Sequence, residues 1–110
     1  MVETLEFDRV DRIADILFGV AHARGLINYG PLARRVQTRP DFIGRQLYTV
    51  SERAFERGEP MWTVLVVAAG ERMPKSGFYE MARRLRPEYA PLGEDEIFER
   101  ERALCYQAAN

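Results

Sequence analysis

Residues 27–47 read INYGPLARRVQTRPDFIGRQL, and the arrangement of apolar and arginine side chains in this stretch decides how the chain is interpreted. Leu32 and Val36 lie four residues apart, a spacing that places both on one face of an α-helix. Pro31 suits the first position of that helix, because an N–H there has no partner within the helix. The stretch therefore predicts a short helix, a tight connection and a longer helix over about residues 40–57.

The sequence on either side predicts three more helices and one strand. Apolar side chains recur at helical spacing over about residues 3–24 and 94–108, and again from residue 76 or 77 to just before Pro87. The run MWTVLVVAA (residues 61–69) is rich in β-branched side chains and predicts one buried strand. Glycine and proline in the following GERMPKSG are typical of a turn. This order of elements is the outline of a winged helix-turn-helix, so the predicted fold class is mainly α.

We expect one domain over residues 1–110. A winged helix-turn-helix-like core with a small β element is expected over about residues 24–78, followed by C-terminal helices over about residues 76–108. The side chains expected to point into the core recur at spacings of three and four; they are Val10, Ile13, Leu17, Val20, Ala21, Leu32, Val36, Phe42, Ile43, Leu47, Val50, Ala54, Phe78, Met81, Ala82, Leu85, Ile97, Phe98, Leu104 and Cys105.

Composition excludes several classes of protein. Hydrophobic residues make up 46% of the chain and charged residues 30%, as in a globular domain. The longest apolar run, residues 64–69, is too short to span a membrane, and the acidic start MVETLEFD does not resemble a secretion signal. The single cysteine, Cys105, cannot form an internal disulfide, and with the single histidine, His22, it cannot build a zinc site. We therefore expect a cytoplasmic protein without a metal or another cofactor.

Charge is distributed unevenly along the chain, although the formal net charge is only -1. Residues 20–60 contain seven arginines against four acidic side chains, which leaves this segment at +3. Acidic residues are concentrated near the two ends. A basic middle segment is typical of a surface that binds an anion such as a phosphate backbone. It is equally typical of solvated helix faces whose charges pair with one another.

Three segments carry a resemblance to a known family. They are GLINYGPLARRV (residues 25–36), FIGRQL (42–47) and EPMWTVLVVAAGERMPKSGF (59–78). They resemble the C-terminal DNA-binding domain of the alkylguanine-DNA alkyltransferases and their alkyltransferase-like relatives. The residues that match best are Tyr29-Gly30, Leu32-Ala33, Ile43-Gly44 and Val66-Val67. The likeness covers about half of the chain and implies a winged helix-turn-helix that binds DNA and flips an alkylated base.

The departures from that family bear on the chemistry. Aligning the two valines places Thr63 where the family has its alkyl-accepting cysteine, Val64 at the family's histidine and Leu65 at its arginine. A hydroxyl without an adjacent base is a poor nucleophile, so alkyl transfer is not expected. Asp41 falls where the family has its base-flipping arginine. Trp62 replaces a proline, and we expect it to be buried, although an aromatic side chain at that position could instead stack on a base.

Seven residues are the candidate nucleic-acid contacts. Tyr29 lies where the resemblance implies a contact to a backbone phosphate, and a phenol at a helix N-terminus can donate to an anion. Ser76 could cap a helix whose free N–H groups, together with Lys75, form a small anion site. The other candidates are arginines expected to contact phosphates: Arg34, Arg35, Arg39 and Arg45. The alternatives are a half-buried Tyr29 packed under the helix turn, arginines on a solvated face and a plain N-cap at Ser76.

The preferred interpretation is a non-catalytic DNA-binding protein of winged-helix type, with no membrane partner. The alternative is a protein-interaction module on the same scaffold, such as an adaptor, an inhibitor or an immunity protein. Charge geometry separates the two interpretations. Arginines gathered with Tyr29 on one exposed face favour DNA, whereas arginines paired with acidic side chains favour a protein partner.

Overall fold

The computed structural model describes residues 2–71 and 73–110, with side chains described at residues 9–71 and 73–110. Within these residues the chain forms five α-helices, two 3-10 turns and two short strands. The elements in chain order are α1 (Val2–His22), β1 (Ile27–Asn28), α2 (Tyr29–Arg35), α3 (Ile43–Glu56), η1 (Trp62–Leu65), β2 (Val66–Val67), α4 (Ser76–Leu85), η2 (Pro87–Tyr89) and α5 (Glu94–Ala108). The predicted mainly α class is confirmed. Over the described ranges, no helix combines the length and the apolar character that crossing a membrane requires.

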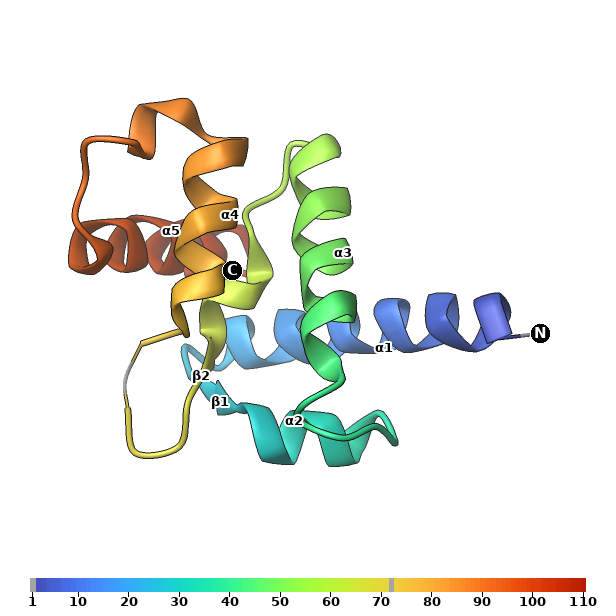
Figure 1. The fold of residues 1–110 in the computed structure, drawn as a ribbon. Coiled ribbons are helices and arrows are strands. Elements are labelled where there is room, and N and C mark those ends of the chain that lie inside the picture. The colour runs from blue at the N-terminus through green and yellow to red at the C-terminus, as the bar shows by residue number, and fades with distance from the viewer. Residues whose placement is uncertain (1, 72) are drawn as a thin grey trace.

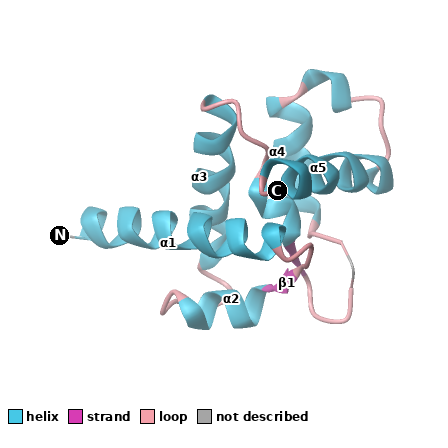
Figure 2. Ribbon diagram, turned by 180° about the vertical axis from the view of Figure 1, so that it is seen from behind, coloured by secondary structure: helices cyan, strands magenta, loops and turns pink. Residues whose placement is uncertain are grey.

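The helices pack around the 3-10 turn η1. Figure 1 shows α3 and α4 standing side by side, with α1 crossing them and α2 below α1. Seen from behind in Figure 2, α1 and α5 lie on the same side of that pair. The turn η1 contacts α1, α3 and α5, and all four of its residues are buried. The centre of the core is therefore an irregular segment and not a sheet.

The β element differs from the predicted strand. Val66 and Val67 of β2 pair in parallel with Ile27 and Asn28 of β1. The prediction of one strand over residues 61–69 is wrong, because the first part of this run forms η1. Every residue from 61 to 67 is buried, and a short run that is apolar throughout does not distinguish a strand from another buried segment. Two parallel strands do not form a hairpin, so the sheet among the described residues is not the β-wing of the predicted outline.

Helix α2 begins slightly earlier than predicted. Its first residue is Tyr29, so Pro31 occupies the third position and not the first. Proline is tolerated there because the N–H groups of a first turn have no partner within the helix. At the other end of α2, Arg12 of α1 donates to the carbonyl of Arg35 at 2.8 Å. A cation is favourable at a helix C-terminus, so α1 holds the end of α2 in place.

Helix α3 begins at Ile43, later than the predicted start near residue 40, because residues 40–42 form a turn. Phe42, which was expected in the core, is 58% exposed. That expectation is wrong because Phe42 precedes the helix, where helical spacing does not determine which way a side chain points. The rest of the predicted inner face is buried: Ile43, Leu47, Val50 and Ala54.

Helices α4 and α5 lie close to their predicted ranges. The expected N-cap at Ser76 is wrong, because Ser76 is the first helical residue and Lys75 occupies the N-cap position without a side-chain hydrogen bond. On α5 the expected core residue Leu104 is 39% exposed. Glu101 takes that place instead, since it lies four residues from buried neighbours on either side and is itself fully buried. Of the other expected core residues, Val20 and Leu85 are only half-buried.

The buried Glu101 carboxylate connects three segments. Its Oε2 accepts the N–H of Met61 at 3.0 Å, just before η1. Its Oε1 accepts Arg86 Nε at 2.5 Å and the Tyr89 hydroxyl at 2.7 Å. Burial, followed by the contact with Glu101, raises the pKa of Tyr89 above its ordinary value. These hydrogen bonds join α5 to the start of η1 and to the segment after α4.

Trp62 and Cys105 are both in the core, as predicted. Trp62 is 5% exposed, and its ring packs against Phe18 of α1 in a T-shaped arrangement with 5.7 Å between ring centroids. The indole Nε1 donates to Glu59 Oε1 at 3.2 Å. Cys105 is fully buried, and this burial raises the pKa of its thiol. A buried thiol with a raised pKa is a weak nucleophile, which fits a purely structural cysteine.

Candidate functional site

A pocket of about 490 Å³ opens where the starts of α2, α3 and α4 come together. This volume is within the range of small-molecule sites. Its polar lining comes from segments far apart in the sequence and consists of Tyr29, Asp41, Tyr48, Thr63, Lys75 and Ser76. Its apolar lining consists of Pro40, Ile43, Leu47, Phe78 and Met81, and the backbone of Gly44 and Gly77 completes the wall. A mixed lining with aromatic rings suits a flat, partly polar ligand.

Helix α3 contributes one face to the pocket. The pocket-lining residues Ile43, Gly44, Leu47 and Tyr48 lie one and four residues apart, a spacing that puts them on one side of a helix. A Cβ added to Gly44 would meet no atom within 4 Å. Gly44 therefore leaves the pocket wall open and is not required by close packing.

Tyr29, the first residue of α2, contacts the loop before α4. Its side chain is half-buried, and its hydroxyl accepts the backbone N–H of Lys75 at 3.5 Å. The Lys75 ammonium lies over the Tyr29 ring, 4.8 Å from its centroid. Burial raises the pKa of the Tyr29 hydroxyl, and the hydrogen bond from Lys75 opposes this. Since the oxygen accepts from Lys75, the hydroxyl proton is available to a ligand.

Thr63 lines the same pocket, although it is 4% exposed. Its Oγ1 lies 2.5 Å from the hydroxyl of Ser51, which is fully buried. Among the described residues this is the side-chain hydrogen bond that Thr63 makes, and Ser51 is not a base. The pair supplies a hydroxyl to the pocket but does not activate a nucleophile.

We expect no alkyl transfer to this protein from alkylguanine DNA. Thr63 stands where the resemblance puts the acceptor cysteine, and the only cysteine, Cys105, is fully buried outside the pocket lining. Intact-mass spectrometry after incubation with methylated duplex should show no added mass. A stoichiometric adduct on any residue would contradict this account of the pocket.

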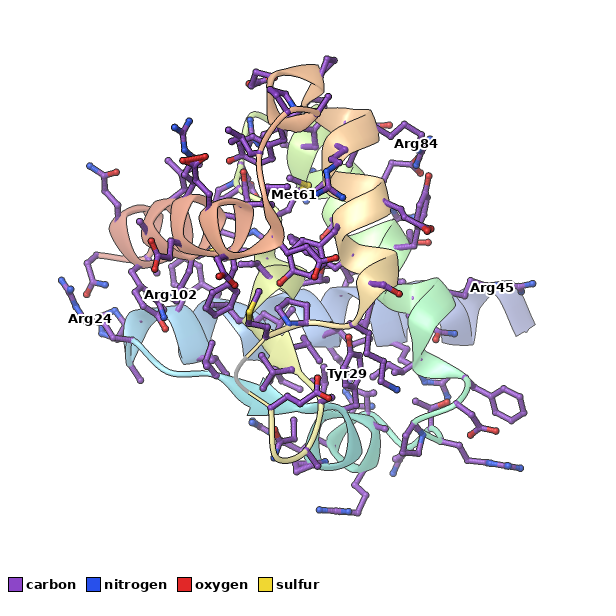
Figure 3. The ribbon with its side chains drawn as sticks, turned by 60° about the vertical axis from the view of Figure 1, so that its left-hand side comes forward. Arg24, Tyr29, Arg45, Met61, Arg84 and Arg102 are labelled. Atoms are coloured by element: carbon purple, nitrogen blue, oxygen red, sulfur yellow. The ribbon has the colours of Figure 1, made fainter. Side chains whose placement is uncertain are left out.

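The candidate arginines lie outside the pocket lining. Arg34 and Arg35 are exposed on α2. Arg39 is exposed and binds the Asp41 carboxylate through Nε at 3.2 Å and Nη2 at 3.0 Å. Arg45 is exposed on α3, and Figure 3 shows it projecting outward from the helix. The structure therefore brings Tyr29 together with two of the other candidates, Lys75 and Ser76. The four candidate arginines do not line the pocket.

Tyr48 was missed by the sequence interpretation. It is 38% exposed, lines the pocket and carries the Arg84 guanidinium over its ring at 5.0 Å from the centroid. Its position four residues after Gly44 was the available signal, because both lie beside the buried stripe of α3. The sequence does not show that α4 packs against this side of α3, so the spacing alone could not identify Tyr48 as a pocket residue.

Comparisons with known proteins were made at the level of families, curated sequences and solved structures. No match was found. Over the described residues, no cluster of three or more His, Cys, Asp or Glu side chains is arranged to hold a metal ion.

Proposed function

We propose that this chain is a non-catalytic DNA-binding protein, in which α2 and α3 contact the duplex and the pocket receives one extruded base. The observation that carries the proposal is the pocket itself. It brings Tyr29 together with Lys75 and Ser76, which lie more than forty residues away in the sequence, at the starts of α2 and α4. Tyr29 is a candidate contact from the motif resemblance, and Lys75 and Ser76 are candidates from the helix-terminus argument.

The chemistry of the lining supports an extruded base as the occupant. Enzymes and binding proteins that extrude a base read it by stacking on aromatic side chains and by hydrogen bonds to its polar edge. Tyr29, Tyr48 and Phe78 offer aromatic surfaces. The hydroxyl of Thr63 and the side chains of Ser76 and Asp41 offer polar partners. No step of bond formation is part of this proposal.

The surroundings of the pocket support contact with phosphates. Arg34, Arg35 and Arg45 are exposed on α2 and α3, the two helices that would form a helix-turn-helix with residues 36–42 as the connection. Arginine side chains of this kind position a protein on the DNA backbone without reading the sequence. The negative charge of Asp41 is offset by Arg39, which removes much of its repulsion toward a phosphate.

A second candidate function is a protein-interaction module. Two ion pairs favour it: Arg53 of the basic middle segment lies 4.0 Å from Asp11 of the acidic N-terminal helix, and Arg39 is bound to Asp41. Part of the positive charge is therefore neutralised by acidic side chains of the same molecule. An acidic surface near the chain ends would then suit a basic protein partner.

Charge reversal tests the DNA proposal. We expect the triple variant Arg34→Glu, Arg35→Glu, Arg45→Glu to bind a short duplex at least ~100-fold more weakly than wild type at low salt, because each lost phosphate contact costs about 1 kcal/mol or more. Fluorescence anisotropy with a labelled duplex measures the affinity. The melting temperature should change little, since all three side chains are exposed.

The matched control carries the same change in charge elsewhere on the surface. Arg24, Arg57 and Arg100 are exposed and do not line the pocket, so their reversal to glutamate should weaken binding by much less. Equal losses in the two triple variants would mean that only net charge matters, and the assignment of α2 and α3 as the contact surface would be wrong.

A further inference from the structure

Lys75 is the only lysine in the chain, and it lies in the wall of the pocket. None of the arginines that the structure describes lines the pocket. The Lys75 ammonium lies over the Tyr29 ring, and no ion pair joins it to a carboxylate of the described residues. An ammonium is a compact charge on a flexible stem, and without an acidic partner it is available to an anion.

Two hydroxyls add hydrogen-bond donors to the same pocket. The Tyr29 oxygen accepts the N–H of Lys75 at 3.5 Å, which leaves its own proton for a ligand. Thr63 is 4% exposed, and its hydroxyl shares one hydrogen bond with Ser51. Two hydroxyls carry two protons, so when Ser51 donates, the Thr63 proton remains for a ligand in the pocket. Lys75 also begins α4 without a side-chain cap, which leaves the first N–H groups of that helix without a partner inside it.

The remaining lining does not oppose an anion. Asp41 is the carboxylate among the lining residues, and the Arg39 guanidinium binds it through two hydrogen bonds. This pair is close to neutral, so the charge of Lys75 decides the sign at the pocket. Tyr48 and Phe78 supply aromatic surface on which a flat ring can pack.

We propose that the pocket binds a small molecule that carries a flat aromatic ring and one anionic group. The anionic group binds Lys75 and the Tyr29 hydroxyl, and the ring lies toward Phe78 and Tyr48. The cavity of about 490 Å³ is large enough for such a ligand. This ligand and an extruded base would exclude each other. The site itself requires no DNA, so it can be tested independently of the proposed function.

A pair of probes that differ only in charge tests the anion site. Isothermal titration calorimetry without DNA should show that 2-naphthoate binds with a dissociation constant of about 1 mM or tighter, and that neutral 2-naphthamide binds at least ~tenfold more weakly. Lys75→Met should weaken 2-naphthoate about tenfold and leave 2-naphthamide nearly unchanged. Arg100→Met is the control, because Arg100 is exposed outside the pocket lining and its loss changes the net charge equally. In parallel, 2-naphthyl phosphate shows whether a phosphate or a carboxylate fits the donors better.

Gly44→Leu tests whether the probe occupies this pocket. A Cβ at Gly44 would meet no atom within 4 Å, so a leucine there enters the open space without a clash and should abolish binding of 2-naphthoate. Leucine also favours a helix more than glycine does, so the variant should stay folded, which circular dichroism checks. Gly19→Leu is the matched control, since Gly19 lies on α1 outside the lining with equally open surroundings.

Three results would overturn the anion site: no binding of 2-naphthoate at millimolar concentration, equal affinity for 2-naphthoate and 2-naphthamide, or undiminished binding to Gly44→Leu. A wild-type protein that binds 2-naphthoate as expected but binds no duplex would keep this site and refute the DNA proposal alone.

Discussion

Replacing Glu101 by alanine is expected to lower the free energy of unfolding by about 3–5 kcal/mol. Glu101 is fully buried and accepts hydrogen bonds from the Met61 N–H, Arg86 Nε and the Tyr89 hydroxyl. Removing the carboxylate leaves these three donors without their partner, and the Arg86 side chain is only 21% exposed. Leaving a partly buried cation without its partner destabilises a fold strongly. This cost is far larger than the stability that an intact pair adds compared with apolar side chains in the same place. Urea denaturation followed by circular dichroism measures the change.

Glu99→Ala provides the control on the same helix. Glu99 is exposed, so its replacement should change stability by less than about 0.5 kcal/mol. Glu101→Gln should be intermediate, since its amide keeps the shape but not the charge. If Glu101→Ala were as stable as Glu99→Ala, the bonds from Glu101 to the start of η1 and to the segment after α4 would not stabilise the fold as described.

Replacing Trp62 by alanine is expected to cost a similar amount, about 3–5 kcal/mol. The indole is 5% exposed and lies in η1, which contacts α1, α3 and α5 at the centre of the core. Removing the indole leaves a cavity between three helices, and the helices cannot all move inward to fill it. In domains near this size each kcal/mol lowers the melting temperature by about 4 °C or more, so differential scanning fluorimetry should show a drop of ~10 °C or more.

Trp62→Phe separates the two contributions of this side chain. It keeps one aromatic ring in the core and removes the hydrogen bond to Glu59 together with part of the indole volume, so its cost should be about 1 kcal/mol above that of the lost volume. Free quenching of wild-type tryptophan fluorescence by iodide would contradict the burial of Trp62. Trp62 would then be a candidate contact residue that could stack on a base.

The helices of the second half were predictable because local signals agree there. Proline and glycine break the chain around residues 87–93, and apolar spacing on either side is regular. The 3-10 turn η1 within residues 61–69 was not predictable, since β-branched residues indicate burial as readily as extension. The sequence does not indicate that Glu101 is buried, because its three donors come from residues 61, 86 and 89 and only the tertiary fold brings them together.

The candidate site was predictable in its parts but not in its assembly. Tyr29, Lys75 and Ser76 were selected from local motifs, and all three line one pocket. The sequence does not reveal that residues 29 and 75 meet, because no local rule relates positions so far apart. It likewise does not reveal that Arg39 binds Asp41 beneath the exposed ring of Phe42.

The salt dependence of duplex binding measures how many phosphates the protein contacts. With an excess of only +3 in residues 20–60, two or three phosphate contacts are expected, each contributing about 0.9 to the slope of log affinity against log salt. Anisotropy titrations of wild type from low to physiological salt should therefore give binding that weakens with a slope of about 2–3. Absence of binding to any duplex, even at low salt and high protein concentration, would contradict the DNA proposal and leave the protein-interaction module as the better account.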